Sequence, residues 1–149
     1  FQRWQFSLGA VSAVFHDVLI VLGIFSLTYK IMPFNMEINQ AFIAALLTVI
    51  GYSLNDTVVV FDRIREFFRI HKSWDNEVTV NTALNSTLSR TLNTSLTTLI
   101  VLTAIFIFGG ESIRGFMFAL IIGVMVGTYS SVFIATPIMF DSFKNKVTN

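Results

Sequence analysis

The sequence predicts an all-α, polytopic transmembrane helical bundle with four spans. Of its 149 residues, 54% are hydrophobic and only 13% are charged, which is more apolar surface than one soluble core of this size can bury. Four apolar runs are each long enough, at about 1.5 Å per residue, to cross a hydrocarbon core of about 30 Å. We therefore expect one transmembrane domain over residues 1–149, with spans at about 6–29, 41–61, 88–108 and 113–140.

The first span, residues 6–29, is interrupted near its middle by His16 and Asp17. Gly9 and Ala13 lie four residues apart on the face that carries Asp17, and such small residues let another helix approach closely. This spacing predicts that Asp17 lies inside the bundle, away from lipid. Alternatively, His16 and Asp17 each simply hydrogen-bond a neighbour.

The second span, residues 41–61, follows a polar segment that suits a short exposed turn. In it Thr48, Tyr52 and Asp56 recur at i+4 spacing and form one polar stripe, which must face protein or water because lipid cannot hydrogen-bond it. A carboxylate near the centre of a spanning helix costs roughly 2.5–3.5 kcal/mol on insertion scales, so Asp56 is a functional-site candidate.

Residues 62–87 are predicted to be a cytoplasmic amphipathic segment. The helical pattern continues to about Lys72, a turn follows at residues 71–76, and Asp75 or Asn76 suits a helix cap before a second amphipathic helix.

The third span, residues 88–108, begins with a polar face. Ser86, Arg90, Asn93 and Thr97 follow one another at helical spacing.

The fourth span, residues 113–140, carries small residues at every fourth position, and Pro137 near its end is expected to kink or stop the helix. The repeat predicts a ridge for helix packing, as Gly9 does in the first span. Its members are Ala119, Gly123, Gly127, Ser131 and Ala135.

Basic residues predict the orientation. With four spans, both termini lie on one side, and that side carries seven basic residues against Lys30 and Arg114 on the other. The positive-inside rule makes the richer side cytoplasmic. The seven are Arg3, Arg63, Arg65, Arg69, Lys72, Lys144 and Lys146.

Asp56 and Arg90 form the pair that could carry chemistry. Both are displaced toward the cytoplasmic half, by roughly 8 Å and 12 Å from the middle of their spans, and the arginine side chain could bridge the offset. The distance to Arg90 would decide whether Asp56 is charged or neutral. The alternative is a permanent ion pair that only fixes helix register. The residues expected to form a polar lining around the pair are Thr48, Tyr52, Asn55, Asn93 and Thr97.

The sequence lacks the residues that other classes of function require. The sequence shows no nucleophile with a base, no phosphate-binding loop and no zinc set, so we predict no enzyme, no metal, no cofactor and no nucleic-acid partner.

Four segments carry a family resemblance. GYSLNDTVVVFDRIRE at 51–66, LGAVSAVFHDV at 8–18, LNSTLSRTLNTSLTT at 84–98 and the glycine-rich fourth span closely resemble, in the same order, the SecF family of protein-export membrane subunits. That family includes the SecF half of fused SecD-SecF proteins and belongs to the resistance, nodulation and division superfamily of proton-driven transporters.

The resemblance implies an accessory of the bacterial protein translocase that couples proton flow across the inner membrane to export through the SecYEG channel. Asp56 and Arg90 match positions of its proton relay, and Asp17 matches a position of less defined role. The implied partners are SecD, SecYEG and, more indirectly, SecA and YajC, besides the exported polypeptide. A half of this kind has six spans and a large periplasmic domain, so these four would be its last. The chain begins at Phe1 without a signal peptide, which also predicts a piece of a longer polypeptide.

Two rival functions stay open. One is a proton-driven small-molecule efflux segment of the same superfamily, and the other is a non-transporting scaffold whose polar residues only fix helix pairing. A scaffold should tolerate Asp56→Asn, whereas a proton carrier should not.

Overall fold

The structure, a computed structural model, describes residues 4–144, and all the regular secondary structure among them is helical. In chain order these are α1 (Trp4–Thr28), α2 (Gln40–Ile70), α3 (Asn76–Phe108), α4 (Glu111–Ser130), the π-helical turn η1 (Ser131–Ala135) and α5 (Thr136–Lys144). Four helical rods are long and apolar enough to cross a membrane, with α4, η1 and α5 forming the fourth. The predicted fold class is therefore confirmed.

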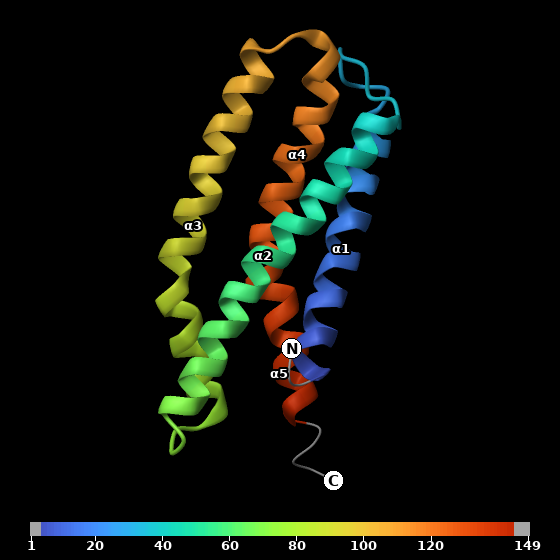
Figure 1. The fold of residues 1–149 in the computed structure, drawn as a ribbon. Coiled ribbons are helices and arrows are strands. Elements are labelled where there is room, and N and C mark those ends of the chain that lie inside the picture. Colours follow the sequence, from blue (N-terminus) through green and yellow to red (C-terminus); the bar gives the residue numbers. More distant parts are fainter. Residues whose placement is uncertain (1–3, 145–149) are drawn as a thin grey trace.

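The rods run up and down side by side (Figure 1). One end, here called the turn end, holds the start of α1, the α2–α3 turn at residues 71–75 and the end of α5. The opposite end, the loop end, holds the α1–α2 and α3–α4 connections. The turn end carries most of the basic residues used to predict the orientation, although Arg3 and Lys146 lie outside the described residues. Those described there are Arg63, Arg65, Arg69, Lys72 and Lys144.

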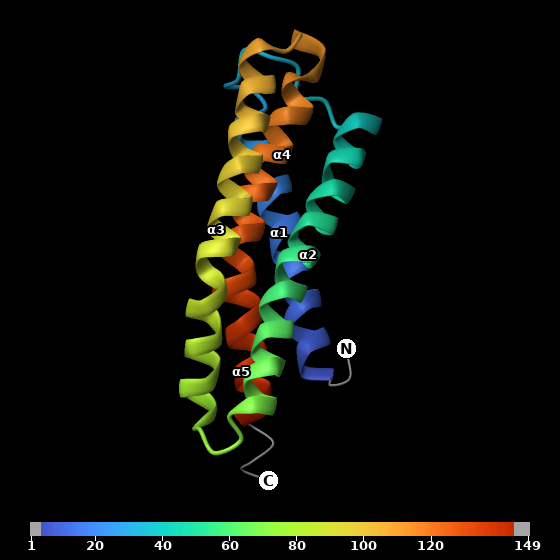
Figure 2. The ribbon, with the colours of Figure 1, turned by 60° about the vertical axis from the view of Figure 1, so that its left-hand side comes forward.

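α3 is the least enclosed rod. It packs against α2 and α4 along one side (Figure 2), and only 11% of its most apolar 18-residue window is buried, against 44% for the fourth rod. α1, α2 and α4 contact one another and form the closed part of the bundle.

Apolar side chains gather in two clusters, one toward each end of the bundle. The turn-end cluster includes Phe6, Phe61 and Met139, and the loop-end cluster includes Val21, Phe42 and Leu120. The segments between the clusters, around residues 17, 53–57 and 127–131, carry buried polar side chains. A polar layer therefore separates two apolar layers.

The small-residue ridge lies where helices approach most closely. A Cβ atom added to Gly123 would overlap the side chain of Val49 on α2, and one added to Gly127 would come within 3.3 Å of Ser53 Cβ. Gly9 of α1 faces the Ala135 carbonyl in the same way. Ala119 and Ser131 are buried on the same line of the fourth rod. These contacts hold the backbones of α2 and α4 close enough for short polar side chains to meet between them.

Pro137 does not stop the fourth rod, which continues to Lys144. The preceding residues, Ser131–Ala135, form a π-helical turn, and the Thr136 hydroxyl donates to the Ser131 carbonyl at 3.0 Å. Because Pro137 has no N–H to donate, the ladder of backbone hydrogen bonds cannot continue unchanged past it. The π turn lies directly before the missing hydrogen bond, and the helix continues beyond it as α5.

The segment 62–87 is helical on both sides of a short turn. α2 runs without a break to Ile70, and α3 begins after Asp75, which occupies the N-cap position without a side-chain cap bond. The rings of His71 and Trp74 stack within the turn, with centroids 3.8 Å apart.

Candidate functional site

Asp17 is a fully buried carboxylate at the meeting point of three helices. Its Oδ2 accepts hydrogen bonds from Ser53 Oγ of α2 and, at 2.8 Å, from Ser130 Oγ of α4. The neighbouring His16 places Nδ1 3.2 Å from Asp17 Oδ1 while its ring stays partly exposed. Two hydroxyls and an imidazole thus satisfy a group that would otherwise be costly to bury.

Asp56 is the second buried carboxylate, and only 7% of it is exposed. Ser131, the residue after Ser130, places its hydroxyl 3.3 Å from Asp56 Oδ2. Thr91 brings its buried hydroxyl close to Asp56 from α3, although outside the geometry of a hydrogen bond within residues 4–144. The surroundings of Asp56 therefore offer fewer fixed donors than those of Asp17.

A row of hydroxyls extends this polar layer toward the loop end. Tyr52 donates to Ser95 at 3.3 Å, and Ser95 lies 2.5 Å from Thr128 Oγ1. The Thr128 carbonyl in turn accepts a hydrogen bond from Ser131 at 3.0 Å. Side chains of α2, α3 and α4 are linked in this way down to the residue that faces Asp56.

Arg90 lies on the outside of α3. Within the described part of the chain it makes no ion pair with Asp56, although it is near enough for its charge to act on that carboxylate. It lines a groove of about 380 Å³ between α2 and α3, together with Arg63, Glu66 and Ser86. Arg63 holds one wall of this groove by donating to Glu66 at 2.6 Å and to Ser86 at 3.1 Å.

Most of the residues predicted to form a polar lining are on the outer surface. Thr48, Asn55, Asn93 and Thr97 are exposed, and only Tyr52 reaches into the bundle. The hydroxyls of Thr48 and Thr97 donate to carbonyls of their own helices, at 2.9 Å and 2.7 Å. The structure thus brings together Asp17, Asp56 and Tyr52 in one layer and leaves the polar face of α3 turned outward.

Sequence reasoning missed the hydroxyl groups of this layer. Ser53 and Ser130 were not singled out, and Ser131 was predicted only as a packing residue. The spacing of Ser53 and Asp56, three residues apart on one helix, was a usable signal, since residues at i and i+3 share a face.

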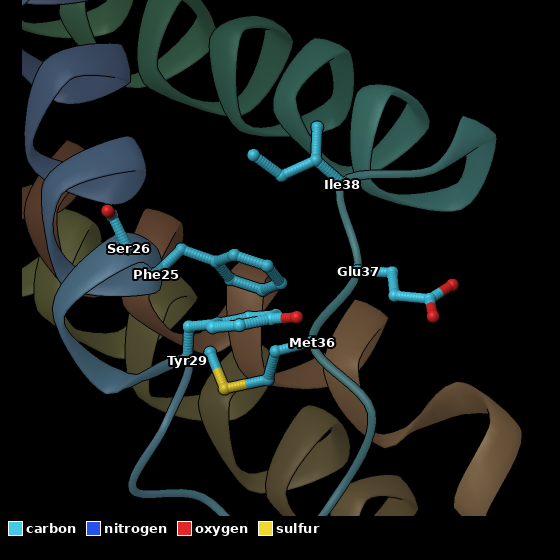
Figure 3. A pocket seen from close by; sticks show the side chains of 6 residues that line it. All are labelled: Phe25, Ser26, Tyr29, Met36, Glu37 and Ile38. Carbon is cyan, nitrogen blue, oxygen red and sulfur yellow. The ribbon is translucent and has the colours of Figure 1, made fainter.

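A second hollow lies at the loop end, apart from the carboxylates. A cavity of about 530 Å³ opens beside the rings of Phe25 and Tyr29, with Met36 below them and the Glu37 carboxylate pointing away (Figure 3). Phe25 follows Asp17 by eight residues, or about 12 Å along the helix. This cavity therefore takes no part in the polar layer.

These features define a class: a multi-pass helical membrane protein with ionisable groups inside its bundle. Groups of this kind inside spanning helices usually mark ion or proton pathways. Comparison with known proteins then identifies the family. The chain belongs to the family described as protein export membrane protein SecD/SecF, C-terminal, whose model matches residues 1–145.

Relatives with both separate and fused organisation are similar to this chain. Protein translocase subunit SecF of Rhodothermus marinus is 61% identical over 93% of the chain and 45% of that relative. Protein translocase subunit SecDF of Brucella abortus is 47% identical over 92% of the chain and 17% of that protein. The chain thus spans less than half the length of these relatives.

Solved structures agree with the fold. The crystal structure of SecDF, a translocon-associated membrane protein from Thermus thermophilus, is 42% identical over 96% of this chain and 19% of that one, with a TM-score of 0.83. SecDF in its super-membrane-facing form matches with a TM-score of 0.84 at 41% identity, over 97% of this chain and 19% of that one.

Proposed function

We propose that this chain is the membrane-embedded part of a SecF-type accessory subunit of the bacterial protein translocase, and that it couples proton flow across the inner membrane to export of proteins through SecYEG. The family and the names of its relatives support the first part. The observation that carries the second is the pair of carboxylates, Asp17 and Asp56, buried between spanning helices.

Asp56 is proposed as the main proton carrier. A carboxylate in this position changes its charge when it binds a proton, and the charged and neutral forms favour different surroundings in low dielectric. Each charge that crosses the membrane makes about 2.3 kcal/mol available per 100 mV. The small residues Gly123 and Gly127 bring α4 close to α2 at Val49 and Ser53, so a change of charge at Asp56 would act on a closely packed pair of helices.

Arg90 is proposed as the countercharge at the entrance to this site. Its groove between α2 and α3 is lined by charged side chains and lies toward the turn end, so it offers protons a polar route to the region of Asp56. Arg90 then acts through its field and not as a fixed ion-pair partner.

SecD is the partner proposed for the polar face of α3, which comprises Arg90, Asn93 and Thr97. All three are exposed in the chain alone. The Thr97 hydroxyl donates to its own helix, but lipid cannot satisfy the side chains of Arg90 and Asn93. Another polar helical surface must therefore cover them in the membrane, and a protein in which both halves are fused, such as the Brucella relative, would supply it. SecYEG, SecA and YajC are proposed as further partners of the whole protein.

The same proposal fixes the orientation. The turn end carries five of the described basic residues, against Lys30 and Arg114 at the loop end, so it faces the cytoplasm. The helices around the α2–α3 turn then extend on the cytoplasmic side, and the chain corresponds to the last four spans of a six-span half that also bears a periplasmic domain.

Export in vesicles tests the proposal. Vesicles carrying the full-length parent protein with Asp56→Asn should lose the component of export that depends on the proton gradient, because an amide cannot carry a proton. Asp75→Asn, a matched change at an exposed residue of the α2–α3 turn, should leave that component unchanged. Insertion and assembly of both variants are checked first.

Unchanged gradient-dependent export with a correctly assembled Asp56→Asn variant would contradict the proposal and favour a scaffold. Transport of a small molecule in place of export would favour the efflux alternative.

A further inference from the structure

We propose that Ser130 and Ser131 are positioning residues that join Asp17 and Asp56 into one two-site unit, in which proton binding at one carboxylate changes the hydrogen bond of the other. This inference rests on the proposed function only in treating both carboxylates as proton-binding groups. Neither serine was predicted to have such a role from the sequence.

Each serine faces a choice between two acceptors. A hydroxyl has one hydrogen and so donates one hydrogen bond at a time. Ser130 Oγ lies 2.8 Å from Asp17 Oδ2 and 3.2 Å from the Gly127 carbonyl oxygen. Ser131 Oγ lies 3.0 Å from the Thr128 carbonyl oxygen and 3.3 Å from Asp56 Oδ2. The first serine is thus closer to its carboxylate and the second is closer to its backbone carbonyl.

The hydrogen-bond distances of the two serines fit opposite protonation states of the two carboxylates. An ionised carboxylate accepts hydrogen bonds only, so the serine donates to it. A protonated carboxyl can donate its own O–H to the serine oxygen, and the serine hydrogen then turns to the backbone carbonyl. The arrangement of Ser130 suits an ionised Asp17, and that of Ser131 suits a protonated Asp56. The proton itself is exchanged with water, through the polar groove between α2 and α3 on the Asp56 side.

The two serines are coupled through the Gly127 carbonyl. This oxygen accepts the backbone N–H of Ser131 and is also the alternative acceptor for the Ser130 hydroxyl. When Asp17 takes up a proton and Ser130 turns fully to Gly127, this oxygen accepts both donors, and its shift toward the Ser130 hydroxyl weakens its bond to the backbone N–H of Ser131. Ser131 can respond because it begins the π turn, where backbone hydrogen bonding already changes register.

Few other ionisable groups lie around this unit. His16 on α1 contacts Asp17, and the ring of Tyr129 on α4 lies 6.2 Å from that of His16. Tyr52 lies on α2 and Arg90 on α3, while η1 contains no ionisable residue. A charge on the His16 ring would act directly on Asp17, so the experiment must remove it.

The test is an infrared titration of the carboxyl groups in the full-length parent protein, purified and reconstituted in lipid vesicles. Asp17→Asn and Asp56→Asn assign the two carboxylic acid bands. Ser131→Ala should then move the midpoint of the Asp17 band by about half a pH unit or more, although Ser131 does not contact Asp17. Ser131→Thr, which keeps the hydroxyl, should restore the wild-type midpoint. A His16→Gln background removes the titration of the imidazole.

Two controls separate this coupling from a structural effect. Ser142→Ala removes a hydroxyl that donates to its own helix carbonyl in α5, at 2.8 Å, and should change neither band. In an Asp56→Asn background, Ser131→Ala should no longer move the Asp17 band, whereas a purely structural effect would persist and add. If Ser131→Ala fails to assemble, Ser131→Cys of similar size takes its place.

An Asp17 midpoint that is unchanged by the Ser131 substitution, or changed equally with and without Asp56, would overturn the proposal. Because the titration needs no export, its failure is distinguishable from failure of the proposed function. Export can depend on Asp56 while the two carboxylates titrate independently.

Discussion

The bundle holds two polar regions, and they differ in how their hydrogen bonds are satisfied. The interior layer around Asp17 is closed, since Ser53 and Ser130 donate to a carboxylate with no exposed surface. The outer face of α3 carries Arg90 and Asn93 in the open. The hydrogen bonds of Asp17 are made within this chain, whereas no described residue covers Arg90 and Asn93 on the outer face. Substitutions in the two regions should therefore behave differently.

The sharpest contrast is expected from Asp17→Ala. It leaves the buried Ser53 hydroxyl without its acceptor, which costs about 1–3 kcal/mol, and turns Ser130 to the longer bond with the Gly127 carbonyl. With the cavity that the lost carboxylate opens, the free energy of unfolding should fall by about 3 kcal/mol. The measurement is unfolding of the full-length parent protein in detergent micelles. Glu37→Ala removes an exposed carboxylate at the loop end and should change stability by no more than about 0.5 kcal/mol. If Asp17→Ala lowered the free energy of unfolding by no more than Glu37→Ala does, the interior hydrogen bonds would not stabilise the fold.

A smaller loss is expected where the interior region depends on close helix packing. Gly123→Ala places a methyl group against the side chain of Val49, and overpacking of this kind typically costs about 1–3 kcal/mol. Gly51→Ala on α2 is the matched control, because no atom lies within 4 Å of the added carbon, and better helix propensity should leave stability unchanged or raised. The same unfolding measurement compares the two. A neutral Gly123→Ala would show that α2 and α4 can separate without cost.

The smallest effect on stability is expected on the outer face. The side chain of Asn93 is exposed and forms no hydrogen bond with any described residue, so Asn93→Leu should alter the free energy of unfolding by less than about 0.5 kcal/mol when SecD is absent. Purification together with SecD should nevertheless recover less complex, because the proposed interface loses a polar contact. Full recovery of the complex would show that Asn93 of α3 does not contribute to the interface with SecD.

The sequence predicted which residues lie inside the bundle better than it predicted which way the polar face of α3 turns. Four apolar runs were enough for four helical rods, because spanning length and composition are local properties. Gly9 and Ala13 predicted the burial of Asp17 correctly, since small residues on one face allow close approach. Helical periodicity also grouped Arg90 with Asn93. It could not say whether that face turns toward α2 or away from it, because the rotation of a helix depends on its neighbours.

The hydroxyl partners were harder to predict. A single serine in a spanning helix commonly donates to a carbonyl of its own helix, so Ser53 and Ser130 give little signal in isolation. Their role depends on three helices that meet at one height, which no spacing within one helix reveals. The π turn at Ser131 was equally hidden, although Pro137 marked the place where the helix had to change.

The unbroken length of α2 has a mechanical consequence. Its 31 residues make a rod of about 46 Å, longer than a hydrocarbon core of about 30 Å. Such a rod acts as a lever. A tilt of about 10° around its loop end would carry its far end through about 8 Å, and the turn at residues 71–75 would move with it. Asp56 lies about 24 Å from the loop end of α2, so a displacement of the helix beside Asp56 would be roughly doubled at the turn.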